Sequence, residues 1–235
     1  MNRAGVGVSL LCALTTAVTG CSATVAGVPT PASTSPVAQG TPLSTSPQPA
    51  TTYPLPVELD GFTMTSDTED MDTEALFTSV VVNTARWSRA LGTDLTVPVA
   101  VPRTDPTACL ITDRVARACD DRIEYDVDQL TADRDAFGDT PVRLIAAHET
   151  GHFIIAAMGG DTPNTSDEDS EARANCVAGA YIATDPAITS SAAGDAYNRT
   201  PLPRAGQGSY TAFQRGFTTL RKGVNPLSVC AGVSG

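Results

Sequence analysis

The sequence is poor in histidine, in lysine and in basic charge overall. Among its 235 residues there are two histidines, and 15 lysines and arginines stand against 26 aspartates and glutamates. Nucleic acid and anionic lipid both attract basic surfaces, so this acidic balance argues against either as an electrostatic partner. The scarcity of histidine also limits the metal sites that the chain can build.

Long hydrophobic runs are scarce as well. The one run, from about Val6 to Val18, is too short to span a bilayer and follows the basic Arg3. It ends in Val18-Thr19-Gly20-Cys21, which resembles a bacterial lipobox. We expect residues 1–21 to be a lipoprotein signal peptide, and fatty-acyl chains such as palmitate on Cys21 to anchor the exported protein to the outer face of the bacterial cell membrane. An ordinary signal peptide with a chance cysteine is the alternative.

Charge is missing altogether between Ser22 and Pro56, where serine, threonine, proline and alanine dominate. Such a segment buries too little apolar surface to offset the entropy cost of ordering it, and its prolines keep it extended. We therefore predict a disordered linker over residues 22–56. The remaining residues, 57–235, are numerous enough for one domain with a hydrophobic core.

Cysteines are few but even in number within this domain. Cys12 lies in the signal segment and Cys21 is the expected lipidation site, which leaves Cys109, Cys119, Cys176 and Cys230. Four cysteines in an exported domain suggest two disulfides, for which three pairings exist. A bond between Cys109 and Cys119 would close a short loop and leave Cys176 and Cys230 to tie the C-terminal segment to the core. A metal site of four thiolates is the alternative, but no C-x-x-C spacing supports it.

Hydrophobic periodicity and capping residues predict a mainly helical domain. We expect helices over residues 73–91, 141–158, 166–183 and 209–223, with Thr140 capping the second. Short strands are expected over residues 95–101 and 122–127, the first an edge strand because of Pro98. Residues 185–208 read as a loop. The predicted fold class is α+β, with helices packed on a small, mainly antiparallel sheet.

Both histidines lie in one motif, His148-Glu149-Thr150-Gly151-His152, within the second predicted helix. Residues four positions apart share a helix face, so the two imidazoles can bind one Zn²⁺ ion. Glu149, beside them, is suited to remove a proton from a water on that ion. A pair of buried structural histidines is the alternative.

A third ligand cannot be a histidine, which excludes the metzincin arrangement. Glu171 follows His152 by 19 positions and lies on the next predicted helix, where it shares a face with Asn175. H-E-x-x-H followed by E-x-x-x-(D/N) is the layout of gluzincins, in which the last position orients a zinc-binding histidine. Asn175 can accept an imidazole N–H without carrying a charge. An ordinary acid at a helix start is the alternative interpretation of Glu171.

At these residues the chain resembles the neutral zinc metallopeptidases of the bacterial envelope. The similarity covers about residues 75–230, and its most specific part is the run E-A-R-A-N-C-V-A-G at 171–179. Further matches are T-A-C at 107–109 with Cys119, I-E-Y-D at 123–126, the H-E-x-G-H helix, and F-Q-R-G-F at 213–217 with Asn225-Pro226 and Cys230. The resemblance implies zinc at His148, His152 and Glu171, Glu149 as base, and the disulfide pairing above. Asn175, in place of an aspartate, departs from the family pattern.

The sequence therefore predicts a zinc peptidase at the cell envelope, with an extended peptide or protein substrate added to an edge strand. Candidate donors to the developing oxyanion are Tyr181, Tyr197, Tyr210 and Arg173, and Tyr125 could line the substrate strand, although packing roles are commoner for such residues. The alternative is a catalytically silent zinc-binding lipoprotein that acts through partners, against which the intact Glu149 argues. A metal-carrier lipoprotein would favour a histidine-rich or aspartate-rich tract, and none is present.

Overall fold

The structure is a computed structural model and describes residues 70–104, 114–162, 165–200, 202 and 208–235. The chain divides into two units, residues 1–48 and 49–235, and everything described belongs to the second. The predicted signal segment, Cys21, the linker and Cys109 lie outside the described residues. Within those residues no helix is both long and apolar enough to cross a membrane.

The four predicted helices are present. They are α1 (Thr73–Ala90), α3 (Thr140–Ala157), α4 (Asp167–Ile182) and α6 (Gly208–Arg221). Asp72 caps α1 by accepting the Ala75 N–H at 2.7 Å, and Ser166 caps α4 by accepting the Asp169 N–H at 3.1 Å. Each short side chain thus satisfies a backbone donor that the first turn leaves without a partner.

The predicted cap of α3 was wrong. Thr140 lies inside the helix, and the N-cap residue is Asp139, whose side chain makes no capping hydrogen bond. Its carboxylate is engaged elsewhere, because Arg134 Nε lies 2.7 Å and Arg143 Nη2 3.9 Å from its oxygens. Pro141 occupies the first turn, as expected.

Three helices were not predicted: α2 (Val127–Phe137), α5 (Ser190–Arg199) and α7 (Pro226–Ala231). The prediction of a loop over residues 185–208 was therefore wrong for its central part. Thr189 caps α5 by accepting the Ala192 N–H at 3.2 Å. Ala193 and Tyr197, four positions apart, bury one face of α5, which packs against α3 and α6. A stripe this short is hard to recognise among so many small residues.

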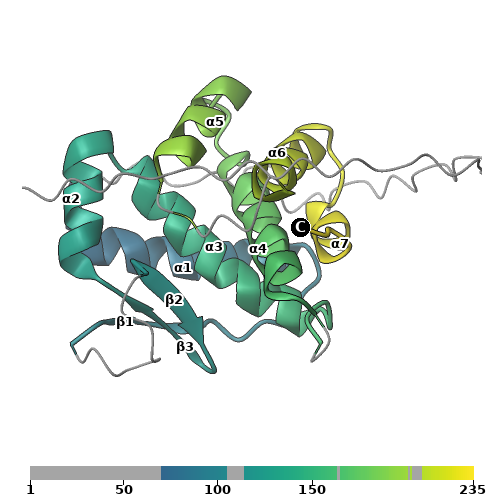
Figure 1. Cartoon of the computed structure of the whole chain (residues 1–235), viewed down its shortest axis with the longest axis horizontal. Helices are drawn as coiled ribbons and strands as arrows, with labels where there is room; N and C mark the ends of the chain where they lie inside the picture. Colours follow the sequence, from purple (N-terminus) through teal and green to yellow (C-terminus); the bar gives the residue numbers. More distant parts are fainter. Residues whose placement is uncertain (1–69, 105–113, 163–164, 201, 203–207) are drawn as a thin grey trace, which may run out of the picture. The chain divides into compact units, whose positions relative to one another are not determined.

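The sheet has three strands, β1 (Val99–Pro102), β2 (Ala116–Cys119) and β3 (Arg122–Tyr125), in the order β1-β3-β2. A tight connection joins β2 to β3 and makes that pair antiparallel, whereas β1 pairs in parallel with the other side of β3. The α+β class is confirmed, but the sheet is mixed and not mainly antiparallel. Both β1 and β2 are edge strands, and β2 packs against α3 (Figure 1).

The core lies around α3, which is buried along nearly its whole length and packs against α1, α4 and β2. One face of α1, with Phe77, Val81 and Trp87, is buried in this core. Phe77 of α1 stacks on Tyr125 of β3 with ring centroids 4.3 Å apart, which joins the helices to the sheet. On the side away from α3, α4 packs against α6 at Gly216, where an added Cβ would lie 1.9 Å from the Cys176 carbonyl oxygen. Only glycine permits so close an approach of the two backbones.

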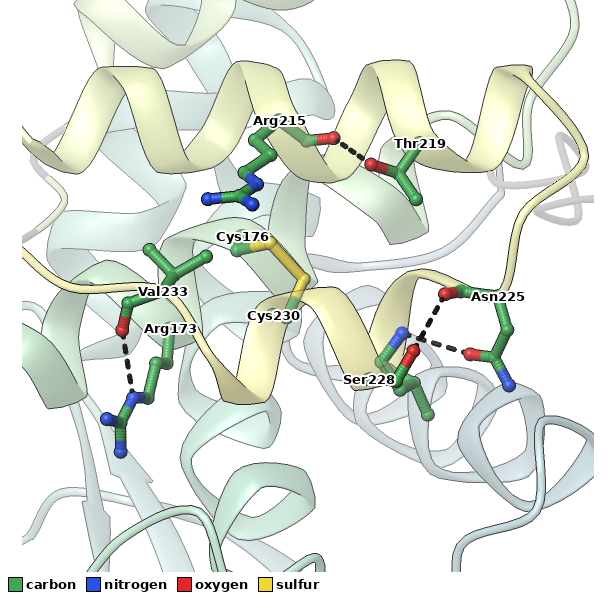
Figure 2. The surroundings of a disulfide bond; sticks show 9 residues. Arg173, Cys176, Arg215, Thr219, Asn225, Ser228, Cys230 and Val233 are labelled. Carbon is green, nitrogen blue, oxygen red and sulfur yellow. Dashed lines mark hydrogen bonds between the residues drawn. A yellow bond between two sulfur atoms is a disulfide. The ribbon is translucent and has the colours of Figure 1, made fainter. Parts of the chain in front are cut away.

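Cys176 of α4 and Cys230 of α7 form a disulfide with Cα atoms 5.4 Å apart (Figure 2). Asn225 begins α7 by accepting the Leu227 N–H at 3.0 Å. The bond holds α7 against the half of α4 that precedes Gly179 and gives the pairing expected from the sequence. Cys119 is also disulfide-bonded, and its expected partner, Cys109, is among the residues not described.

Candidate metal centre

Helix α3 carries both histidines on one buried face. The His148 side chain is fully buried, the His152 side chain is 19% exposed, and their ring centroids lie 4.9 Å apart. Glu149, between them in sequence, is 3% exposed. The predicted spacing of four residues thus brings the two imidazoles together at the wall of the core.

Helix α4 brings Glu171 to the same point. Glu171 Oε2 lies 3.0 Å from His148 Nε2 and 3.7 Å from His152 Nε2. One ligand atom from each of the three residues falls within 4.8 Å of the other two. The helices approach closely enough because residue 151 is glycine: a Cβ there would lie 3.1 Å from Ala174 Cα.

Asn175 determines which nitrogen of His148 faces Glu171. Its side-chain oxygen lies 3.1 Å from His148 Nδ1. An amide oxygen can only accept, so Nδ1 carries the proton and Nε2 presents a lone pair toward Glu171. This is the position in which the sequence predicted Asn175, next to a candidate zinc ligand.

The atoms that face one another at this point lack the partners that burial normally requires. Among the described residues, neither His148 Nε2 nor Glu171 Oε2 has a hydrogen-bond partner, although both are buried. Buried polar atoms are nearly always satisfied, and a shared metal ion is a common reason for an exception. Two imidazole nitrogens and one carboxylate oxygen also form a ligand set typical of Zn²⁺ with an open fourth position. The residues present therefore fit a zinc ion.

The electrostatics of the site are set by these contacts. Burial acts to raise the pKa of Glu171, but the two histidines beside it hold that pKa well below its ordinary value. Burial acts to lower the pKa of His152, yet the carboxylates of Glu171, Glu149 and Asp161 raise it above its ordinary value. A proton and a metal ion would therefore compete for His152 Nε2.

Arg114 is a site residue that the sequence did not reveal. Its Nη1 lies 2.7 Å from Glu171 Oε1, and its side chain is 39% exposed. The two oxygens of Glu171 are therefore divided, with Oε1 toward Arg114 and Oε2 toward the histidines. No sequence motif links Arg114 to Glu171, 57 positions later, so only the folded chain could identify the pair.

Edge strand β2 reaches the site through its backbone. The Ala118 N–H donates to Glu149 Oε2 at 2.7 Å. This contact fixes the position of the Glu149 carboxylate and brings the strand edge beside the two histidines. Strand β2 was not predicted from the sequence, because a strand of four residues is too short to show a clear alternation of apolar and polar side chains.

Two cavities adjoin along β2. One, of about 300 Å³, is lined by Arg114, Arg117, Ala118, Glu149, His152, Asp167, Ser170 and Glu171. The other, of about 540 Å³, is lined by Arg117, Ala118, Cys119, Asp120, Arg122, His152, Phe153, Ala156 and Asp161. The two share Arg117, Ala118 and His152, so both cavities reach His152.

The tyrosines suggested from sequence lie elsewhere. Tyr181 is buried, packs edge-on to Trp87 with centroids 5.9 Å apart, and has its pKa raised by burial to about 12. Tyr197 packs against Phe213 at 4.7 Å and Tyr210 at 5.4 Å. Tyr125 is buried against α1. None of them lines either cavity, and Arg173 does not either.

No family model, no curated protein and no solved structure matches the chain.

Proposed function

We propose that the protein is a zinc-dependent peptidase that hydrolyses peptide bonds at the cell envelope. The observation that carries the proposal is the convergence of His148, His152 and Glu171, with Glu149 held beside them at a cavity. The resemblance of these same motifs to neutral zinc metallopeptidases is consistent with it.

The roles of the chain's own residues follow from their contacts. His148, His152 and Glu171 would hold one Zn²⁺ ion, which when bound lowers the pKa of a water and polarises a carbonyl group. Glu149 takes the proton of the attacking water and delivers it to the leaving amine. The Ala118 N–H keeps the Glu149 carboxylate in place for this transfer. Arg114 places positive charge at the cavity wall, where the carbonyl oxygen becomes negative.

An extended peptide is the substrate that the surroundings favour. Strand β2 is an edge of the sheet and lines both cavities through Ala118. A peptide that paired with this edge would run past His152 with room for side chains on either side. Phe153 and Ala156 give the larger cavity an apolar wall, whereas its other lining residues are mostly charged.

Export and lipid anchoring through Cys21 are part of the proposal and rest on the N-terminal sequence. The disulfide between Cys176 and Cys230 supports an oxidising compartment, since such bonds are rare in a reducing cytosol.

The experiment is a matched pair, the full chain and its Glu149→Gln variant. We expect both to bind about one zinc ion by elemental analysis, and the variant to cleave a peptide library about 10²–10⁴-fold more slowly. Removal of zinc by a chelator should abolish cleavage, and added zinc should restore it. If the wild type binds zinc but cleaves nothing that the variant does not, the peptidase proposal fails and a catalytically silent zinc-binding protein takes its place. If it binds no zinc, the metal centre itself is wrong.

A further inference from the structure

We propose that Ser170 and Asp161 form a positioning pair that orients His152 for metal binding. The inference rests on the proposed zinc site and goes beyond it, because no motif of the sequence assigns a role to either residue. Ser170 directly precedes Glu171 on α4, and Asp161 lies in the connection that follows α3.

Hydrogen bonds link His152, Ser170 and Asp161, and their donors all point from His152 toward Asp161. Ser170 Oγ donates to Asp161 Oδ2 at 3.0 Å and lies 3.3 Å from His152 Nδ1. A serine hydroxyl has a single proton, and a carboxylate can only accept it. The Ser170 oxygen must therefore accept from His152, so Nδ1 carries the proton and Nε2 keeps its lone pair on the side of Glu171.

Asp161 is itself held in place. Arg173 Nη1 lies 3.3 Å from Asp161 Oδ1 and also contacts the Gly160 carbonyl oxygen. Arg173 Nε donates to the Val233 carbonyl oxygen at 3.0 Å, as Figure 2 shows. Because Arg173 holds the Asp161 side chain in place, the direction in which the Ser170 hydroxyl donates is fixed as well.

The two histidines consequently have different supports. His148 is fully buried and is held by the neutral Asn175, whereas His152 is partly exposed and is held by a hydroxyl that donates to a carboxylate. A partly exposed imidazole that lines both cavities has more freedom to rotate than a buried one, and a hydroxyl that donates to a carboxylate restrains it more strongly than a neutral amide. The geometry thus places the stronger restraint on the ligand that needs it.

The test compares Ser170→Ala, Ser170→Thr and Asp161→Asn with the wild type in the full chain. Zinc affinity is measured by competition with a chelator, and the electronic spectrum of the Co²⁺-substituted protein reports the ligand geometry. We expect Ser170→Ala and Asp161→Asn to bind zinc about tenfold more weakly with an altered cobalt spectrum, and Ser170→Thr, which keeps the hydroxyl, to restore most of the affinity. Ser190→Ala, a helical serine that bonds to the Gln214 side chain and lines neither cavity, is the matched control.

The outcomes separate this inference from the proposed function. Unfolding temperatures of the metal-free proteins show whether a variant has lost its fold, and Ser170→Thr gives an answer even if Ser170→Ala does not fold. Unchanged affinity and spectrum in folded Ser170→Ala or Asp161→Asn would overturn the positioning pair and leave the zinc site standing. A wild type that binds neither zinc nor cobalt would overturn both.

Discussion

The two faces of α4 need different kinds of residue, although both are formed by the same nine residues, 171–179. Toward α3, Glu171 and Asn175 lie one helical turn apart and contact His148. Toward α6 and α7, Cys176 is disulfide-bonded and its carbonyl oxygen lies against Gly216. The face toward α3 needs polar atoms that point at His148, whereas the face toward α6 needs small residues that let the two helix backbones approach closely.

This difference means that the two faces should respond separately to mutation. A change on the face toward α3 should alter metal binding while the metal-free protein remains folded. A change on the face toward α6 should lower the free energy of unfolding and leave the ligand atoms intact. The following changes probe that separation, from the largest expected effect to the smallest.

Glu171→Ala should remove most of the bound zinc. Only two imidazoles would remain, and the metal would lose its negatively charged ligand. Elemental analysis after dialysis measures the zinc content, and the unfolding temperature of the metal-free variant shows whether it is still folded. Full retention of zinc would mean that another residue is the third ligand.

Loss of the disulfide should be the largest change on the other face. The bond joins residues 54 positions apart, and a loop of that length corresponds to about 4 kcal/mol of stabilisation through the unfolded chain. The double variant Cys176→Ser, Cys230→Ser should therefore unfold at lower denaturant concentration. Where it remains folded, its zinc affinity should match that of the wild type, and a parallel loss of both would show that the two faces are coupled.

Gly216→Ala should destabilise the fold by about 3 kcal/mol. The new Cβ would lie 1.9 Å from the Cys176 carbonyl oxygen, so α6 must move away from α4. Equilibrium unfolding in urea measures the change, with Ala212→Gly as a control that removes a methyl group from the same helix without adding one. A variant as stable as the wild type would contradict the close crossing of α4 and α6.

Zinc affinity should fall as the pH is lowered through the titration of His152. The raised pKa of His152 means that its protonated form stabilises the metal-free protein, a contribution present below the pKa of an unfolded histidine, about 6.5, and lost as pH rises through the higher folded value. Zinc must displace that proton to bind. Chelator competition at a series of pH values should show the decline, and a flat profile would exclude His152 as a ligand.

Asn175→Asp should have the smallest effect, a gain in zinc affinity of about tenfold or less. A carboxylate would accept the same His148 Nδ1–H at 3.1 Å and add negative charge behind the ligand. Chelator competition at pH 8 measures it, with the unfolding temperature as a check on the buried charge. A large loss of affinity would mean that the neutral amide is required.

The sequence predicted which candidate ligands come together better than it predicted their surroundings, for a physical reason. His148, His152, Glu171 and Asn175 lie on two helices at spacings of four, and helical geometry alone brings such pairs to one face. Arg114 and Ala118 reach the site from a strand region far away in sequence, and Asp161 reaches it from a connection. Tertiary packing determines those contacts, and no local periodicity encodes them.

The same contrast holds for the fold. The four longest helices, α1, α3, α4 and α6, were predicted, whereas α5, α7 and β2 are short and gain their stability from packing. The parallel pairing of β1 with β3 could not be read from either strand, because strand direction depends on the path of the chain between them. Thr140 shows the limit of capping rules. It is a good capping residue, but the N-cap position falls one residue earlier, at Asp139, whose carboxylate pairs with Arg134.

The disulfide between Cys176 and Cys230 also decides which parts of the chain can bear mechanical load. The loop that it closes joins cysteines 54 positions apart, and its contour length of roughly 190 Å cannot be extended by a pulling force until the bond is reduced. Helices α5 and α6 lie inside that loop and would carry no tension, whereas α3 and the first part of α4 lie outside it. If the chain were stretched from its two ends under oxidising conditions, the contact between His148 and Glu171 would be lost, while the segment between Cys176 and Cys230 would bear no tension.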